Sequence, residues 1–412
     1  MKFILAVLLI LFASYADIFL FRVGVIPLQP SSFLIPLFLV ICVVKYSILD
    51  FGDLFKTHSI KIFASILFFS LFYSAFTPVP MDLIVKKISL DAITILLYIF
   101  AVHFFRTEDK WLVFLVMFGA FVTLAGSVWY DYFVGLPKFS KSIEEMVRKG
   151  GFGENPNQAS SGIKFLALGV LVFLYRFKTK KILFVTAMVV SVFLTFSRSG
   201  IISVILILIF GTANSWDTKF KINATSLFKS SFKMIIVFAA LYVGLVMFAG
   251  IIKSEFPELA RGAMGDRIDL LTGQGESSVV SEDIGSGGGR GDLLFMYIDK
   301  FIQNPFGYGT AYTSDQRLVP LNTHNYYLFL AVNYGFLALI LYLIYLWVGF
   351  RLSIKRDQFY YIIFLALLFF EGFVSHQIYY ERAMLITLAF FDSLIYSKNT
   401  EPNESIPLNK SI

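Results

Sequence analysis

Residues 176–197 of the chain read RFKTKKILFVTAMVVSVFLTFS, a short basic segment followed by an apolar run. The first six residues hold four Lys or Arg and no acidic residue, a pattern typical of a cytoplasmic connection between membrane helices. The run that follows approaches the about 20 mainly apolar residues that a helix needs to cross a bilayer. Eleven further segments share this character, and the twelve predicted spans are 3–21, 33–49, 60–77, 88–105, 111–130, 160–175, 182–197, 199–214, 233–252, 326–350, 359–375 and 383–397.

The composition indicates a membrane protein and excludes a water-soluble globule. Of the 412 residues, 57% are hydrophobic and 15% are charged, whereas soluble domains have about 45–50% and about 25%. Cys42 is the single cysteine, so neither a disulfide nor a cysteine metal site is expected. We therefore predict an all-α polytopic membrane protein with about 12 transmembrane helices, in which residues 1–412 form a single integral membrane domain.

The distribution of basic residues predicts the orientation in the membrane. With the N-terminus inside, the predicted cytoplasmic pieces hold 19 of the 35 Lys and Arg. Both termini are then cytoplasmic, and residues 398–412 form a cytoplasmic tail. The first span also resembles a signal peptide with a cleavage site at 14–16. We expect it to remain uncleaved, because apolar sequence resumes directly after that site.

The longest polar stretch, residues 253–324, is predicted to form a large loop on the outer side. It holds 6 Lys or Arg and 10 Asp or Glu, so its net charge is −4. A nucleic-acid partner is not expected, because such binding needs a concentrated basic face. Residues 273–289 are rich in Gly, Ser and acidic residues and are predicted to be mobile. Apolar residues at helical spacing over 292–303 predict an amphipathic helix, lying on the membrane surface or against the bundle.

Two arginines are candidates for anion binding. Arg198, in the segment TFSRSG at 195–200, is expected at the outer boundary of a tight hairpin. It is either a side chain that anchors a helix end or a ligand for phosphate, since its guanidinium is always charged and bonds bidentately. Arg290 follows glycines and precedes the predicted helix. That position is either a flexible linker or an anion site at a helix N-terminus.

Histidines supply the candidates for proton transfer. His324 and Asn325 stand where the polar loop meets the tenth span. His324 is either a helix cap or interfacial anchor, or a general base, because its unperturbed pKa of about 6.5 suits proton removal at neutral pH. His376 is the reserve acid or base, in a second polar group near the outer face with Glu371, Glu381 and Arg382.

Other patterns in the chain carry weaker expectations. Metal-ligand motifs are missing from the sequence, so neither a metal site nor another cofactor is expected. Tyrosines near the outer boundary are expected to anchor the protein at the lipid interface, with stacking on sugars as the alternative. These tyrosines are Tyr326, Tyr327, Tyr379 and Tyr380.

Several short motifs occur in a fixed order over residues 182–345. They are TFSRSG at 195–200, Arg290 with Leu294, the series Pro305, Gly307 and Gly309, and His324-Asn325 followed nine residues later by Gly335. Together they resemble the O-antigen ligase/polymerase superfamily of bacterial membrane glycosyltransferases. Ala338 stands where the ligase pattern has a second glycine, a small-for-small change.

The resemblance implies a GT-C-like helical fold in the bacterial inner membrane, with residues 253–324 as a periplasmic loop. It implies a metal-independent transfer from an undecaprenyl-pyrophosphate-linked glycan to lipid A–core, for a ligase, or to another lipid-linked glycan, for a polymerase. Arg198 and Arg290 would hold the pyrophosphate, and His324 would take the acceptor proton. A ligase is preferred to a polymerase. The alternatives from other classes are a flippase or other transporter, and a membrane protein whose outer loop only recognises a partner.

Overall fold

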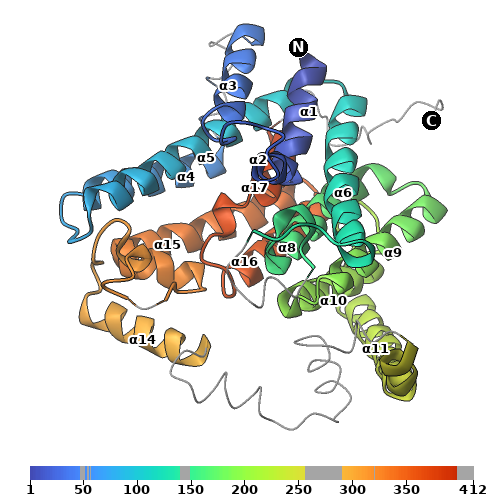
Figure 1. Ribbon diagram of the computed structural model, residues 1–412. Helices are drawn as coiled ribbons and strands as arrows, with labels where there is room; N and C mark the ends of the chain where they lie inside the picture. Colours follow the sequence, from blue (N-terminus) through green and yellow to red (C-terminus); the bar gives the residue numbers. More distant parts are fainter. Residues whose placement is uncertain are drawn as a thin grey trace.

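The computed structural model describes residues 1–46, 52, 55, 57–139, 149–255, 290–319 and 321–396. Helices and connecting segments make up this part of the chain, and it contains no strand (Figure 1). The all-α prediction is therefore confirmed for the described residues. The predicted mobile stretch 273–289 and the predicted tail 398–412 lie outside them.

Each predicted span contains at least one helix. The helices are α1 (Lys2–Ala13), α2 (Ala16–Arg22), α3 (Leu34–Lys45), α4 (His58–Tyr73), α5 (Met81–Thr107), α6 (Lys110–Phe133), α8 (Pro156–Leu174), α9 (Lys178–Leu194), α10 (Arg198–Ala213), α11 (Ala224–Glu255), α14 (Arg290–Gln303), α15 (Tyr326–Lys355), α16 (Phe359–Glu371) and α17 (Arg382–Ile395), with short 3-10 turns η2 (Gly151–Gly153), η3 (Tyr312–Ser314) and η4 (Ile378–Tyr380).

Length and apolar content qualify four of the described helices, α5, α6, α8 and α15, as able to cross a membrane alone. A fifth span results if α1 and α2 are counted as one broken span. Other apolar helices, such as α4 and α10, are shorter than a full span. The protein is thus a multi-pass helical membrane protein, while twelve spans and a GT-C-like fold remain predictions.

The first predicted span, 3–21, is wrong as a single straight helix. It is divided between α1 and α2, whose axes differ in direction by 75°. Tyr15 adopts a left-handed backbone conformation with φ +61°, which ends one helix and starts the next. Ser14 donates its hydroxyl to the Ile10 carbonyl (2.7 Å), so a local side-chain bond accompanies the break.

Several of the described segments at or next to the predicted cytoplasmic pieces contact one another. Each of four polar contacts joins two residues that are far apart in the sequence. These contacts are Lys2 to Asp109 (3.0 Å), Tyr46 to Glu108 (2.7 Å), the His58 N–H to Tyr396 (3.2 Å) and the Phe359 N–H to the Thr218 carbonyl (2.9 Å). The number of spans, and the membrane side that these segments face, remain predictions.

Helix α8 lies at the centre of the bundle (Figure 1). It contacts α6, α9, α10, α16 and α17, and it is the most deeply buried of the spanning helices. Its last two turns contain no charged residue, but Lys164 lies in its middle. Because a buried ammonium needs a partner, this lysine predicts an acidic group on a neighbouring helix.

Candidate functional site

Arg198 is the first residue of α10, directly after a sharp turn from α9. Phe196 turns the chain with φ +51°, and Ser197 caps α10 by accepting the Gly200 N–H (3.2 Å). The Ser197 hydroxyl also donates to the side-chain carbonyl of Asn157 (2.8 Å), at the start of α8. The Arg198 side chain is exposed, so the turn presents a solvent-facing cation beside two helix N-termini.

His324 lies just before α15 and is held by backbone geometry. It has φ +47°, a conformation that non-glycine residues adopt infrequently. On its two sides, the Thr323 hydroxyl donates to the Asn325 carbonyl (2.9 Å), and Asn325 caps α15 by accepting the Leu328 N–H (3.0 Å). His324 is exposed and Asn325 is buried. Asn325 is thus a structural cap, whereas the imidazole of His324 is accessible to a substrate.

The two candidate histidines lie side by side. Their ring centroids are 5.5 Å apart with the planes nearly perpendicular. Burial, and then the nearby His324, lower the pKa of His376 from 6.5 to about 4. Its Nε2 atom is buried without a hydrogen-bond partner among the described residues. His376 is therefore neutral at pH 7, a state in which it can accept a proton or donate its ring N–H.

A buried ion pair and two hydrogen bonds connect α10, which carries Arg198, to α15, which follows His324. Lys164 of α8 pairs with Glu371 at the end of α16, and Ser203 of α10 donates to the same carboxylate (3.2 Å). The next residue, Gly372, accepts the Tyr326 N–H (2.7 Å) at the start of α15. The carboxyl end of α16 is thus bonded to both α10 and α15, so the two candidate residues lie at the same end of the bundle.

Arg382, assigned to the second polar group, is engaged in an ion pair. Its guanidinium contacts the buried carboxylate of Asp17 and lies over the Phe12 ring, 5.6 Å from the centroid. Arg382 therefore fixes the start of α17 against α1 and α2. A substrate that used this arginine would have to displace Asp17, so its position favours a structural role.

Glu381, immediately before α17, lies in a cluster of incompletely satisfied polar groups. Burial, and then the neighbouring Glu371, raise the pKa of Glu381 from 4.5 to about 8. Its Oε2 atom is buried and has no hydrogen-bond partner among the described residues. The same holds for the buried Tyr15 hydroxyl and Ser161 hydroxyl. Such atoms are normally paired in proteins, so this cluster has capacity for additional hydrogen bonds from water or a ligand.

Arg290 is the first residue of α14, and its side chain lies outside what the structure describes. The helix predicted over 292–303 is confirmed as Arg290–Gln303. It packs against α15, below it in the view of Figure 1, through the buried Leu293 and Tyr297. Tyr297 also donates to the Leu321 carbonyl, which connects α14 to the segment before His324.

The glycines of the motif series mark a close approach of two backbone segments. Helix α15 is interrupted at Gly335, which has φ +76° and ψ −177°. The carbonyls of 332 and 333 accept the N–H groups of 308 and 309 (2.8 and 2.9 Å), and the Phe336 N–H donates to the Pro305 carbonyl (2.9 Å). A Cβ on Gly335 would lie 2.6 Å from the Phe306 backbone. The segment that packs against Gly335 is the non-helical chain at 305–309.

The tyrosines predicted to anchor at the lipid interface lie mainly in the protein interior. Tyr326, Tyr327 and Tyr379 are buried, and Tyr326 contacts the rings of Tyr379 and Tyr342 at centroid distances of 5.1 Å. Tyr380 donates to the Asp91 carboxylate (2.6 Å). The prediction was wrong because composition and proximity to a span end do not say which face of a helix carries each ring.

Charged residues within the predicted spans were given no role among the candidates above. Lys164 is completely buried, and Lys87 and Asp91 on α5 form a second buried pair with both side chains almost inaccessible. Intramembrane ionisable residues mark functional or structural centres, so this signal was present in the sequence. Among the described residues, no group of three or more His, Cys, Asp or Glu is arranged to hold a metal ion.

Comparison with known proteins identifies the family of the segment that contains most of these features. Residues 182–343 match the family described as O-antigen ligase. This part of the chain is similar to the O-antigen ligase family. The match confirms the resemblance carried by the motifs and supports a ligase- or polymerase-type membrane enzyme of polysaccharide biosynthesis. No curated protein matches the chain.

Proposed function

We propose that the protein is a glycosyltransferase of the ligase type, which moves a glycan from an undecaprenyl-pyrophosphate carrier onto a sugar hydroxyl of lipid A–core. The donor and acceptor are both membrane lipids, and the reaction takes place on the periplasmic side of the bacterial inner membrane. The N and C termini are then cytoplasmic. Neither nucleic acid nor a metal ion takes part.

One observation supports this proposal: Arg198 and His324 are both exposed, lie at the same end of the bundle and fall within the segment that matches the O-antigen ligase family. The Glu371 and Gly372 contacts join the helices that begin beside them. In the proposed reaction, the acceptor oxygen attacks the anomeric carbon of the donor sugar as His324 removes the hydroxyl proton. The bond between that carbon and the pyrophosphate oxygen breaks, and the leaving group takes the electron pair.

The arginines act on the leaving group. Further negative charge develops on the pyrophosphate as the sugar–oxygen bond breaks, and a fixed guanidinium stabilises that charge most in the transition state. Arg198 begins α10, where the dipole of the helix also favours an anion. Arg290 occupies the equivalent position at the start of α14. Asn325 holds His324 in place through the cap of α15, and His376 beside it is the reserve acid or base.

The proposal is tested by complementing a deletion strain with wild type or with His324→Ala, Arg198→Ala or Arg290→Ala, and separating surface glycan on a gel. Each variant is expected to leave bare core while lipid-linked polymer accumulates. Removing one charge-stabilising group costs about 10²–10³ in rate. The control is Arg356→Ala, an exposed arginine at the opposite end of the bundle, which should support normal glycan.

Two outcomes would change the assignment. Core that bears a single repeat unit in the variants would identify a polymerase rather than a ligase. Normal glycan from all three variants, with the protein present at wild-type amount, would show that these residues are not catalytic. Purified protein supplied with lipid-linked donor and acceptor should form product without a membrane gradient, and a requirement for a gradient would instead indicate a transporter.

A further inference from the structure

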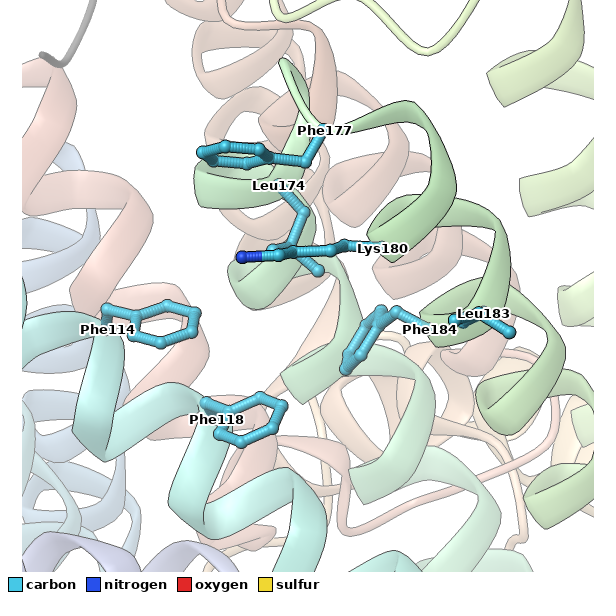
Figure 2. A pocket seen from close by; sticks show the side chains of 7 residues that line it. All are labelled: Phe114, Phe118, Leu174, Phe177, Lys180, Leu183 and Phe184. Atoms are coloured by element: carbon cyan, nitrogen blue, oxygen red, sulfur yellow. The ribbon is translucent and has the colours of Figure 1, made fainter. Parts of the chain in front are cut away.

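An apolar groove of about 370 Å³ lies between α6 and α9, a size typical of pockets for small organic ligands. Aromatic and aliphatic side chains form its walls, and one lysine enters it (Figure 2). The lining residues are Phe114, Phe118, Leu174, Phe177, Lys180, Leu183 and Phe184. Phe118 and Leu183 are exposed, so the groove is open to the surroundings of the bundle.

The groove lies at the end of the bundle opposite the candidate site. Helix α8 begins at Pro156, beside the Arg198 turn, and Leu174 is its last residue. Helix α9 begins at Lys178 and ends just before that turn. The groove extends along α9 no further than Phe184, so the remaining turns of α9 separate it from Arg198. It is not the place where the proposed reaction binds its donor.

Lys180 places a cation in these apolar surroundings. Figure 2 shows its side chain extending between Phe177 and the phenylalanines of α6, and its Nζ lies 4.9 Å from the Phe177 ring centroid. Lys180 forms no salt bridge within the described part of the chain. The adjoining Arg176 and Lys178 are also exposed, and the whole segment 176–181 contains no acidic residue.

These features specify a ligand with an apolar chain and an anionic head. An acyl chain is complementary to the aromatic walls, because it removes their exposed apolar surface from contact with water or loosely packed lipid. A lipid head group with a phosphate and no ammonium is complementary to the basic turn, because its negative charge would compensate the charge of Lys180. Basic residues at a membrane surface attract anionic lipids with about 1 kcal/mol per residue.

We propose that this groove is a binding site for an anionic phospholipid, with one acyl chain between α6 and α9 and the phosphate at Lys180 and the turn before α9. The site is independent of the proposed catalytic function. A lipid bound there would cover the exposed side of Phe118 and Leu183 and would join α6, α8 and α9. Its occupancy is therefore expected to stabilise the folded protein.

The test is native mass spectrometry of the purified full-length protein titrated with two lipids that have the same chains, palmitoyl-oleoyl phosphatidylglycerol and palmitoyl-oleoyl phosphatidylcholine. The wild type is expected to bind the phosphatidylglycerol more tightly. Lys180→Gln should weaken phosphatidylglycerol binding about fivefold, the loss expected for one basic residue, and leave phosphatidylcholine binding unchanged. Lys355→Gln, which changes an exposed lysine outside the groove at the same end, should change neither.

A second variant tests the apolar half of the site. Leu183 is largely exposed at the groove, so Leu183→Trp is expected to fold and to obstruct the groove, lowering the binding of both lipids. Equal affinity of the wild type for the two lipids would overturn the proposal. So would an unchanged phosphatidylglycerol affinity in Lys180→Gln, or displacement of phosphatidylglycerol by glycerol phosphate at equal concentration, which would show that the acyl chain contributes nothing.

Discussion

The buried pair of Lys164 and Glu371 gives the most direct test of the structure. The Lys164 side chain is 0% exposed and the Glu371 side chain 5%, so replacing either residue leaves the other charge without its partner inside the bundle. Breaking a buried pair in this way costs about 3–5 kcal/mol. We therefore expect Lys164→Met and Glu371→Leu each to lower the free energy of unfolding by about that amount.

The double variant separates pairing from packing. When both residues are replaced by apolar side chains, no uncompensated charge remains, and such replacements are often neutral or stabilising. Ser203 then loses its acceptor, at a cost of about 1–3 kcal/mol for an unsatisfied buried hydroxyl. The double variant is thus expected to be more stable than either single variant, with a coupling energy of about 3 kcal/mol or more.

The measurement is denaturant unfolding of the purified protein in detergent, followed by tryptophan fluorescence, for the wild type, both single variants and the double variant. Lys86→Met is the matched control, because Lys86 is exposed on α5, and its effect should stay within about 0.5 kcal/mol. A Lys164→Met variant as stable as this control would refute the burial of the pair. Additive effects of the two substitutions would refute their contact, and with it the ion pair between α8 and α16.

Three further outcomes are expected. Gly335→Ala should destabilise the protein in thermal unfolding, because its Cβ would lie 2.6 Å from backbone atoms at φ +76°, whereas Gly126→Ala, with nothing within 4 Å, should not. The raised pKa of Glu381, about 8, means that the folded state holds its proton more tightly than the unfolded state, so stability should fall as pH rises from about 4.5 to about 8. Glu381→Gln should flatten this slope and exposed Asp299→Asn should not, and equal slopes would contradict the raised pKa of Glu381. Ser197→Ala should cost about 1 kcal/mol through loss of the α10 cap, and no change in unfolding would show that the cap contributes little.

Local patterns in the sequence predicted the helices well. Apolar length located a helix in each predicted span, and helical spacing located α14 to within two residues of its start. The break at Tyr15 was not predictable in the same way, because 3–21 contains no Gly or Pro to indicate it. A tertiary contact, the pairing of Arg382 with Asp17 directly after the break, accompanies it instead.

The contacts that organise the candidate site were beyond sequence reasoning for a physical reason. Lys164 and Glu371 are 207 positions apart, and Asp17 and Arg382 are 365 apart. No periodic pattern connects such residues, since which helices become neighbours depends on the packing of the whole bundle. Buried charges in apolar helices do indicate that a partner must exist. They do not identify it, and Arg382 was therefore counted with the site although Asp17 engages it.

The backbone pairing between 305–309 and 332–336 also has a consequence for how the length of the chain between these segments can vary. Because hydrogen bonds hold these two segments together, the chain between them is a loop whose ends stay in place when its length changes. A longer loop costs little stability, since the entropic cost of closing a loop grows only with the logarithm of its length. Insertions between 315 and 321 would thus change the segment that precedes His324 without shifting the register of α15. We expect natural variation in chain length to concentrate there. A longer loop would change which substrates reach His324, while the helices of the bundle keep their positions.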